Sequence, residues 1–242
     1  MSPSLATGEL EFAQTIARQI GIRHTTIQTE EINDPAYAQN APDRCYHCKT
    51  NLYLRLGEPT KQLAVAVIAN GANADDLSDY RPGGQAAHER AVRSPLAECN
   101  ITKHDVRELA RAWGLPVWDK PAAPCLASRV AYGEEVTPER LAMIDRGEQF
   151  LRALGLREVR VRYHRGDLAR LEVPAAAVAQ LAEPDSRNAL VAELRELGFK
   201  YVTLDLEGLR SGSLNDVLPA GLSAGLVTPS AGSWTAPTWR RR

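Results

Sequence analysis

The sequence predicts an α/β protein, with a parallel sheet in its first part and a smaller α+β domain in its second part. Helical periodicity in the first part surrounds the apolar run 63–69, which is typical of a parallel strand buried on both faces. After Gly133 the pattern changes to two alternating segments, 158–163 and 168–173, joined by a turn. A hydrophobic share of 44% in 242 residues allows one large domain or two modest ones.

The first elements follow from the spacing of apolar residues and from turn residues. Residues 9–20 carry their apolar side chains on one helical face, and a short strand is expected at 24–28. The polar stretch 30–43 contains prolines and predicts a loop. Residues 44–56 predict the next helix.

The run 63–69 is expected to be a buried parallel strand of the first domain. The loop 70–76 leaves its C-terminal end, which is where ligands bind in open α/β sheets. Residues 102–113 begin with a capping box and predict a helix that Gly114 ends. Residues 117–118 are a further short strand candidate.

The second part begins with a helix that Thr137 caps and that ends near Gly155. After the hairpin, helices are expected at 174–181 and 186–197, and a last strand at 199–206. The predicted regions are a first domain over 1–133, a small α+β domain over 134–217 and a frayed, Gly-, Ser- and Pro-rich tail over 218–242.

Composition limits the classes of function. A formal net charge of −1 argues against a protein that binds nucleic acid through bulk phosphate attraction. The longest apolar run is too short to cross a bilayer, and the first residues do not form a secretory signal. We therefore expect a cytoplasmic protein whose cysteines serve metal or redox chemistry rather than disulfides.

Three cysteines form a pair and a distant single residue, Cys45 with Cys48 and then Cys125. Three thiolates can hold an iron–sulfur cluster and leave one iron open for chemistry. The alternatives are half of a structural zinc site or ordinary buried thiols. Cys125 lies in a proline-rich loop near Arg129, which favours a reactive thiolate. Cys99 has no obvious partner and is expected to be inert.

Two polar clusters are candidate binding sites. Asn73, Asp75, Asp76 and Asp79 could bind a ribose, an adenine edge or Mg²⁺, or could simply satisfy the backbone of their own loop. Arg160 and Arg162 share one face of the first hairpin strand and suit a phosphate or a carboxylate. The alternative for this face is a solvated surface with a weak cross-strand ion pair.

Several segments, in this order, resemble the LarE family of ATP-dependent sulfur transferases, and the resemblance extends over nearly the whole chain. The matching segments are Ser2-Pro3-Ser4-Leu5, Arg44-Cys45-Tyr46-His47-Cys48-Lys49, Gly71-Ala72-Asn73-Ala74-Asp75-Asp76, residues 79–83 and 93–96, Asp119-Lys120-Pro121, Cys125-Leu126-Ala127-Ser128-Arg129, Val159-Arg160-Val161-Arg162, and residues 201–206 and 210–213.

The resemblance implies a Rossmann-like parallel sheet of the adenine nucleotide alpha hydrolase type, carrying a PP-loop ATP pyrophosphatase, followed by a small C-terminal domain. ATP with Mg²⁺ would adenylate a carboxylate of pyridinium-3,5-biscarboxylic acid mononucleotide, and sulfur would then displace AMP. The sulfur would come from Cys125 itself or through a [4Fe-4S] cluster held by Cys45, Cys48 and Cys125.

The resemblance also assigns the remaining site residues. Those expected to bind the substrate are Ser128, Arg129, Glu148, Arg160, Arg162 and Glu172, and those expected to lie on the nucleotide side are Gly71, Asn73, Asp75 and Asp76. The expected partner is this small nucleotide substrate, without a membrane or nucleic acid. The expected assembly is a homo-oligomer, and the resemblance leaves the sulfide donor open.

The Ser-Gly-Gly-x-Asp-Ser phosphate loop of the family, expected before Ser2, is not found in this sequence. That loop supplies the backbone amides that bind ATP phosphates. The alternatives to a sulfur transferase are therefore an inactive truncated homologue, a nucleotide-binding module, or a related PP-loop enzyme that thiolates tRNA.

Overall fold

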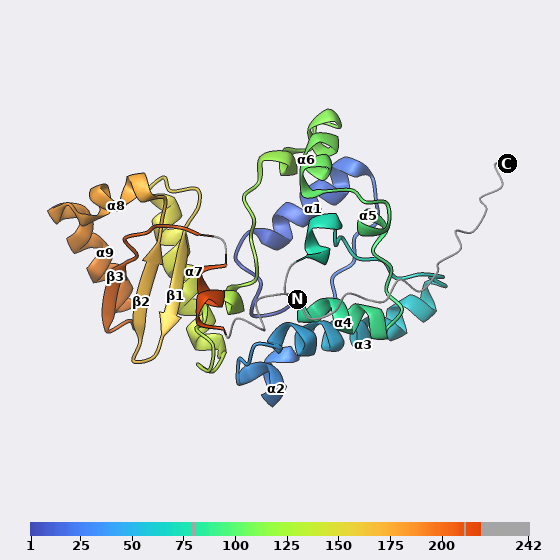
Figure 1. The fold of residues 1–242 in the computed structure, drawn as a ribbon, viewed down its shortest axis with the longest axis horizontal. Helices are drawn as coiled ribbons and strands as arrows, with labels where there is room; N and C mark the ends of the chain where they lie inside the picture. The colour runs from blue at the N-terminus through green and yellow to red at the C-terminus, as the bar shows by residue number, and fades with distance from the viewer. Residues whose placement is uncertain (79–80, 211, 219–242) are drawn as a thin grey trace.

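In the computed structural model, residues 1–78, 81–210 and 212–218 are described, and the statements below refer to these residues. The chain forms a helical N-terminal part and a C-terminal part built on a sheet, which lie side by side (Figure 1). The predicted tail falls outside the described residues except for Leu218, as do residues 79, 80 and 211 of the matching segments. The boundary expected at residues 133/134 stays a prediction.

Helices dominate the N-terminal part, and the predicted ones are present. Helix α1 spans Glu9–Ile20 and ends at Gly21, which adopts a left-handed conformation. The remaining helical elements are η1 (Glu31–Asn33), α2 (Pro35–Ala38), α3 (Arg44–Gln62), η2 (Ala74–Leu77), α4 (Pro82–Glu89), α5 (Pro95–Glu98), α6 (Lys103–Ala112), η3 (Pro116–Asp119) and η4 (Leu126–Arg129). The capping box expected at the start of α6 is present, with Thr102 and Asp105 bonding each other's backbone N–H groups.

The strands predicted for this part are wrong, and no Rossmann-like parallel sheet is seen among the described residues. Residues 24–28 form no strand, and residues 117–118 belong to η3. The run 63–69 begins as the C-terminal end of α3, with Ala64 in a left-handed conformation at φ 50°. Its one bridge is an isolated parallel contact between Ala69 and Arg93. A strand needs neighbours to exchange hydrogen bonds, and this run lacks them over most of its length.

The sheet of the C-terminal part confirms the predicted hairpin. Strands β1 (Arg160–His164) and β2 (Leu168–Glu172) are antiparallel, and β3 (Tyr201–Leu204) adds to β2 in parallel. The strand order is therefore β1-β2-β3. Helices α8 (Ala175–Ala182) and α9 (Pro184–Glu196) connect β2 to β3. The parallel pairing requires such a crossover.

The main hydrophobic core lies between this sheet and helices α7 (Pro138–Ala153), α8 and α9. Val161, Ala169 and Leu171 point from the sheet into the core and are fully buried. Helix α7 packs on β1, and its Gly147 allows the close approach of Val161 and Leu194. Since strand side chains alternate, the opposite face of β1 carries Arg160, Arg162 and His164.

The N-terminal part has a smaller separate core. Tyr53 of α3 packs there with Ala86, Ala87 and Val92. In contrast, Leu63, Val65 and Val67 of the predicted strand are exposed. The helices of this part are thus held by a few apolar contacts and by hydrogen bonds between loops.

None of the helices in the described residues is long and apolar enough to cross a membrane.

Gly208 controls the path of the segment that follows β3. It has φ +76°, and a Cβ atom at this position would lie 2.9 Å from the Val173 carbonyl oxygen. We expect Gly208→Ala to lower the free energy of unfolding by about 2–4 kcal/mol, because it combines left-handed strain with a backbone clash. Chemical denaturation measures this change.

Gly155→Ala is the matched control. Gly155 has φ +90°, but a Cβ atom there would meet no atom within 4 Å. Its replacement should cost only the left-handed strain, about 1–2 kcal/mol. Equal costs at the two positions would contradict the close contact with Val173.

Candidate functional site

The structure brings the three predicted cysteines into one neighbourhood. Cys45 and Cys48 lie in the first turns of α3, and Cys125 is the residue before η4. All three are free thiols, and Cys48 is the least exposed of them. Burial, and after it the proximity of Cys125 and Glu31, raises the pKa of the Cys48 thiol to about 12. Cys48 is therefore a neutral thiol at pH 7 in this arrangement.

Buried polar groups surround these thiols. The Tyr37 hydroxyl lies 2.5 Å from Ser4 Oγ, and burial raises its pKa. The Glu31 carboxylate is 1% exposed and accepts a hydrogen bond from the Ser2 hydroxyl through Oε1. Its Oε2 atom is buried without a hydrogen-bond partner. Buried polar atoms without a hydrogen-bond partner are rare in folded proteins.

The three thiols suit a [4Fe-4S] cluster by their chemistry, because such clusters are bound by cysteine thiolates. Their side chains are not arranged as a formed metal site: within the described ranges, no group of three or more His, Cys, Asp or Glu could hold a metal ion. Each thiol turns about a single side-chain bond, and a change of rotamer moves the sulfur by about 3 Å. The donor set therefore fits a cluster, while its assembly is a prediction.

A buried ion pair ties the Cys125 loop to the C-terminal part. Arg129 is 3% exposed and Glu148 of α7 is fully buried. The guanidinium donates from Nε to Glu148 Oε1 at 2.8 Å and from Nη2 to Oε2 at 3.3 Å. Its Nη1 atom donates to the carbonyl oxygens of Pro124 and Cys125 and to Ser128 Oγ. Arg129 thus fixes the backbone on either side of the Cys125 Cα atom.

A second buried network lies on the polar face of the sheet. Arg162 Nη2 donates to Glu172 Oε2 at 2.8 Å and to Ser213 Oγ at 3.0 Å, and its Nη1 donates to the Ser128 carbonyl oxygen at 2.8 Å. Ser213 Oγ in turn donates to Glu172 Oε1 at 2.6 Å. The charge of Arg162 is therefore neutralised within the protein, and its Nε atom remains buried without a partner.

Arg160 differs from Arg129 and Arg162 in its exposure and in its hydrogen bonds. It is half-buried, and its recorded hydrogen bond is a long one, 3.5 Å from Nη1 to the carbonyl oxygen of Arg210. No ion pair involving Arg160 is present in the described part of the chain. Burial, then Arg162 and Arg129, lowers the pKa of its guanidinium. A cation that lies close to other cations, without a carboxylate of its own, is suited to an anionic ligand.

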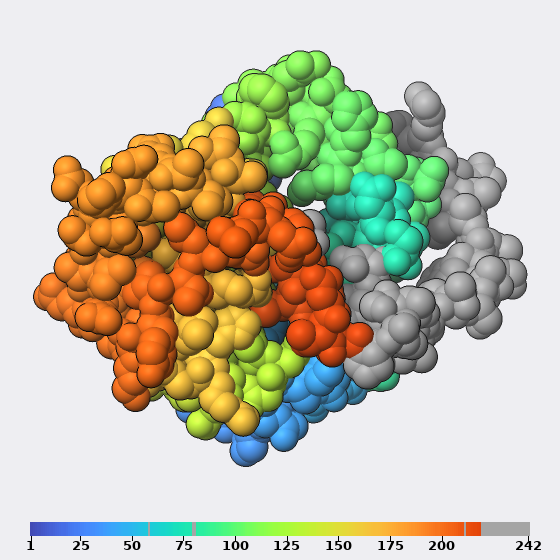
Figure 2. Space-filling view, turned by 60° about the vertical axis from the view of Figure 1, so that its left-hand side comes forward, coloured from blue at the N-terminus to red at the C-terminus, as the bar shows by residue number. Residues whose placement is uncertain are grey.

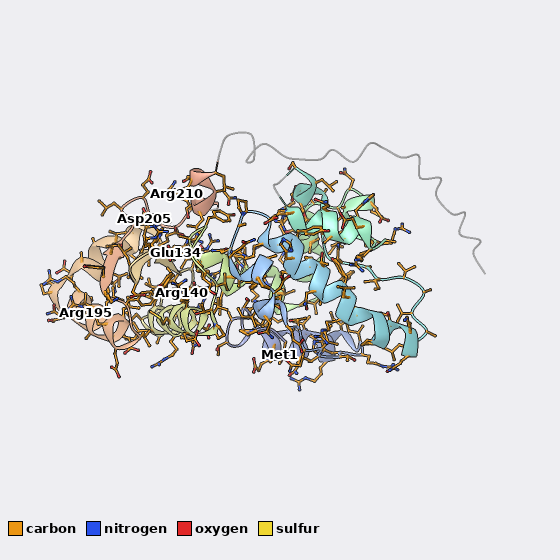
Figure 3. All side chains as sticks on the ribbon, turned by 90° about the horizontal axis from the view of Figure 1, so that it is seen from below. Met1, Glu134, Arg140, Arg195, Asp205 and Arg210 are labelled. Carbon is orange, nitrogen blue, oxygen red and sulfur yellow. The ribbon has the colours of Figure 1, made fainter. Side chains whose placement is uncertain are left out.

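The segment after β3 covers this polar face. In the space-filling view, residues 205–210 lie beside the region of β1 and β2 (Figure 2). Asp205 and Arg210 come from this segment, and both lie on the C-terminal part (Figure 3). Asp205 pairs with Arg170, which also lies 3.2 Å from Glu172. Arg170 Nε donates to Nε2 of His164 at 3.1 Å.

The acidic loop, residues 70–76, makes hydrogen bonds between its side chains and backbone groups of the protein. Asn73 Oδ1 accepts from the backbone N–H of Asp75, and Asp76 Oδ2 accepts from that of Asn73, which makes a capping box for η2. Asp75 Oδ2 accepts from the backbone N–H of Lys103 at 2.7 Å. These bonds agree with the structural alternative for the loop. The nucleotide-binding roles predicted for Gly71, Asn73, Asp75 and Asp76 stay predictions.

The structure thus joins two of the predicted groups through the η4 turn. The cysteine neighbourhood and the arginine face meet at Ser128 and Arg129, whereas the acidic loop makes its recorded bonds with other segments. Sequence reasoning missed Glu31, Tyr37 and Arg44, since their burial depends on contacts between distant segments. Arg44 stands directly before Cys45, and this position was the one signal that pointed to it.

Searches with family models found no match to the chain. Comparison with curated proteins found an uncharacterised protein of Synechocystis sp., 50% identical over 218 residues, which span 90% of this chain and 81% of that protein. A second relative is the pyridinium-3,5-bisthiocarboxylic acid mononucleotide synthase of Lactiplantibacillus plantarum, 37% identical over 210 residues, or 87% of this chain and 75% of the synthase. An uncharacterised protein of Methanocaldococcus jannaschii is 29% identical over 210 residues, or 87% of this chain and 79% of that protein.

These relatives place the chain among proteins homologous to a synthase of a thiocarboxylated nucleotide. At 37% identity over three quarters of that synthase, the relation is well beyond chance similarity. The chain belongs to the LarE family.

His164 should make stability depend on pH. Burial, then the neighbouring Arg170 and Arg162, lowers its pKa below the ordinary value of 6.5, against the opposite effect of Glu172 and Glu134. Below pH 6.5 the unfolded chain therefore binds more protons at this residue than the folded protein does. We expect the free energy of unfolding to fall as the pH drops from 7 to below 6.

Denaturant unfolding at a series of pH values measures this loss. His164→Gln retains an acceptor for Arg170 and should flatten the decline. His104→Gln replaces an exposed histidine of α6 and should leave it unchanged. A decline of the same size in all three proteins would assign it to other groups.

Proposed function

We propose that this protein is a sulfur transferase that converts a carboxylate of pyridinium-3,5-biscarboxylic acid mononucleotide into a thiocarboxylate. The observation that carries the proposal is the η4 turn, where the Cys125 loop is bonded to the buried arginines of the substrate-binding face. Kinship with the Lactiplantibacillus plantarum synthase supports the same chemistry. A sulfur source next to an anion-binding surface is what such a reaction requires.

The proposed reaction has two steps. A carboxylate oxygen of the substrate attacks the α-phosphorus of ATP, which forms an acyl-adenylate and releases pyrophosphate. A sulfur nucleophile then attacks the acyl carbon, the C–O bond to AMP breaks, and a thiocarboxylate remains. ATP with Mg²⁺ supplies the activation, and the residues of this chain position the acyl group and the sulfur.

The proposal includes two sources of sulfur. In one, the Cys125 thiolate forms a thioester, its Cα–H proton is removed, and the Cβ–S bond breaks to leave dehydroalanine and the thiocarboxylate. In the other, Cys45, Cys48 and Cys125 would hold a [4Fe-4S] cluster, which would supply a replaceable sulfide. The thiol of Cys125 is exposed and suits either role.

The substrate anion is assigned to Arg160. Arg129 and Arg162 already have carboxylate partners, Glu148 and Glu172, so they shape the surface and hold Ser128. Arg160 has no carboxylate partner among the described residues and can bond a phosphate or a carboxylate in a bidentate manner. The roles of Ser128, Arg129, Glu148, Arg162 and Glu172 in substrate binding remain part of this proposal.

Replacement of the cysteines tests the sulfur source. After anaerobic incubation with iron and sulfide, the wild-type protein should show the broad absorption band of an iron–sulfur cluster, and Cys45→Ser, Cys48→Ser and Cys125→Ser should lose it. Cys99→Ser is the matched control, because Cys99 is exposed at the end of α5. A band of equal strength in all four variants would rule out the three-cysteine cluster.

Sulfur transfer from Cys125 itself can be measured in the same experiment. Transfer from Cys125 leaves that residue short by one H2S, which mass spectrometry of the peptide detects. The substrate should be offered already adenylated, so that the outcome does not depend on ATP activation by this chain. A thiocarboxylate formed by Cys125→Ser without any cluster would contradict both sources.

Arg160→Gln tests the substrate site. Because the variant removes a cation but no internal ion pair, it should weaken the binding of nicotinic acid mononucleotide, a pyridinium nucleotide with phosphate and carboxylate, by roughly tenfold or more. Isothermal titration calorimetry measures the affinity. Arg157→Gln is the control, since Arg157 is exposed and pairs with Asp119. Unchanged affinity in Arg160→Gln would show that the anion binds elsewhere.

A further inference from the structure

Arg44 is a buried arginine at the first position of α3, directly before Cys45. It is 6% exposed, and its Nη1 atom donates to Asn40 Oδ1 and, at 2.8 Å, to the Ala127 carbonyl oxygen. Both acceptors are neutral. Within the described residues, Arg44 forms no ion pair. A buried charge without a counter-charge is costly, because neither water nor an opposite charge compensates it.

The groups near Arg44 that can carry negative charge are thiols and phenols. Cys45 is the next residue in the chain, Cys125 and Tyr37 lie near the guanidinium, and the bond to the Ala127 carbonyl oxygen brings Arg44 to the turn that follows Cys125. Arg129 and Arg162, by contrast, each face a buried carboxylate. The buried cation at the cysteine neighbourhood is thus left to be balanced by sulfur.

The same side chain joins the two segments that carry the cysteines. Its bond to Ala127 connects the start of α3 to the η4 turn. Asn40, fully buried with φ 58°, accepts from Arg44 and donates to the carbonyl oxygens of Val130 and Ala131, at 3.2 and 2.8 Å. Arg44 and Asn40 therefore hold the Cys45–Cys48 turn against the Cys125 loop.

We propose that Arg44 is a positioning residue that holds the two cysteine segments together and neutralises a negatively charged assembly of the Cys45, Cys48 and Cys125 thiolates. This inference rests on the proposed three-cysteine sulfur site and adds that the occupied site carries a negative charge. The site should favour an anionic occupant over a neutral one of the same coordination. Arg44 would act through the thiolates, without contact with the acyl substrate.

Two inorganic probes separate charge from geometry. Cd²⁺ reacts with three thiols to form an anionic trithiolate and release three protons. Arsenous acid, As(OH)3, reacts with three thiols to form a neutral trithiolate and three waters. Both products need the three sulfur atoms in one place, but only the cadmium product carries the negative charge that Arg44 would stabilise.

The test compares Arg44→Met, which removes the charge, with Arg44→Lys, which retains it. Ultraviolet sulfur-to-metal charge-transfer absorption gives the affinity for each probe, and thermal unfolding reports on the fold. Arg44→Met should weaken Cd²⁺ binding roughly ten- to a hundredfold more than arsenite binding, because only the cadmium product carries a negative charge that a nearby cation stabilises at an effective dielectric constant of about 20. Arg44→Lys should keep the wild-type ratio of the two affinities. Arg55→Met, an exposed position on the same helix, is the control.

The other outcomes overturn the inference. An equal loss of both affinities in Arg44→Met, or a changed ratio in Arg44→Lys, would leave Arg44 only a structural role. Wild-type binding that survives serine replacement of any one cysteine would show that the trithiolate does not form. Neither probe uses ATP or the acyl substrate, so a failure here is distinct from a failure of sulfur transfer, which the thiocarboxylate and the loss of H2S report.

Discussion

The buried pair of Arg129 and Glu148 is the interaction on which the candidate site depends. It joins the loop of Cys125 to helix α7, and Glu148 Oε1 also accepts the backbone N–H of Val161 in β1. Three successive elements, η4, α7 and β1, therefore meet at one carboxylate. Buried ion pairs contribute little net stability compared with apolar residues, but the loss of one partner leaves an uncompensated charge that costs about 3–5 kcal/mol. The main effect of the pair is thus to fix the positions of η4, α7 and β1 relative to one another, rather than to raise the stability of the fold.

The four arginines near the candidate site, three buried and one half-buried, are of two kinds. Arg129 and Arg162 are neutralised by Glu148 and Glu172, and they donate to main-chain carbonyl oxygens of the η4 turn. Arg44 and Arg160 have no carboxylate partner among the described residues. Arg44 lies by the cysteines and Arg160 on the sheet face. Positive charge without a carboxylate partner therefore lies at the places proposed for the sulfur and for the substrate anion. The charges of the other two arginines, Arg129 and Arg162, are neutralised by carboxylates.

The sequence was informative where local chemistry decides the structure. The alternation in residues 158–173 predicted the hairpin, and the capping residue Thr102 predicted the start of α6. The run 63–69 has the composition of a buried strand but lies exposed, because strand formation depends on partners that its own residues cannot specify. For the same reason the opposite environments of Arg160 and Arg162, two residues apart on one strand face, could not be predicted. The two arginines differ because Glu172 and Ser213 lie within hydrogen-bond distance of Arg162.

The contacts of Arg129 also explain how a loop can be rigid and its thiol reactive. Its guanidinium bonds the carbonyl oxygens of Pro124 and Cys125, and Ser128 Oγ donates to the same Cys125 carbonyl at 2.7 Å. The backbone of Cys125 is held on both sides, whereas none of these bonds involves its sulfur. An exposed thiol on a fixed backbone loses little entropy when it reaches a bound acyl group, which is the advantage of placing a nucleophile on a supported turn. The polar network around η4 would therefore serve the proposed sulfur donor as much as the proposed substrate site.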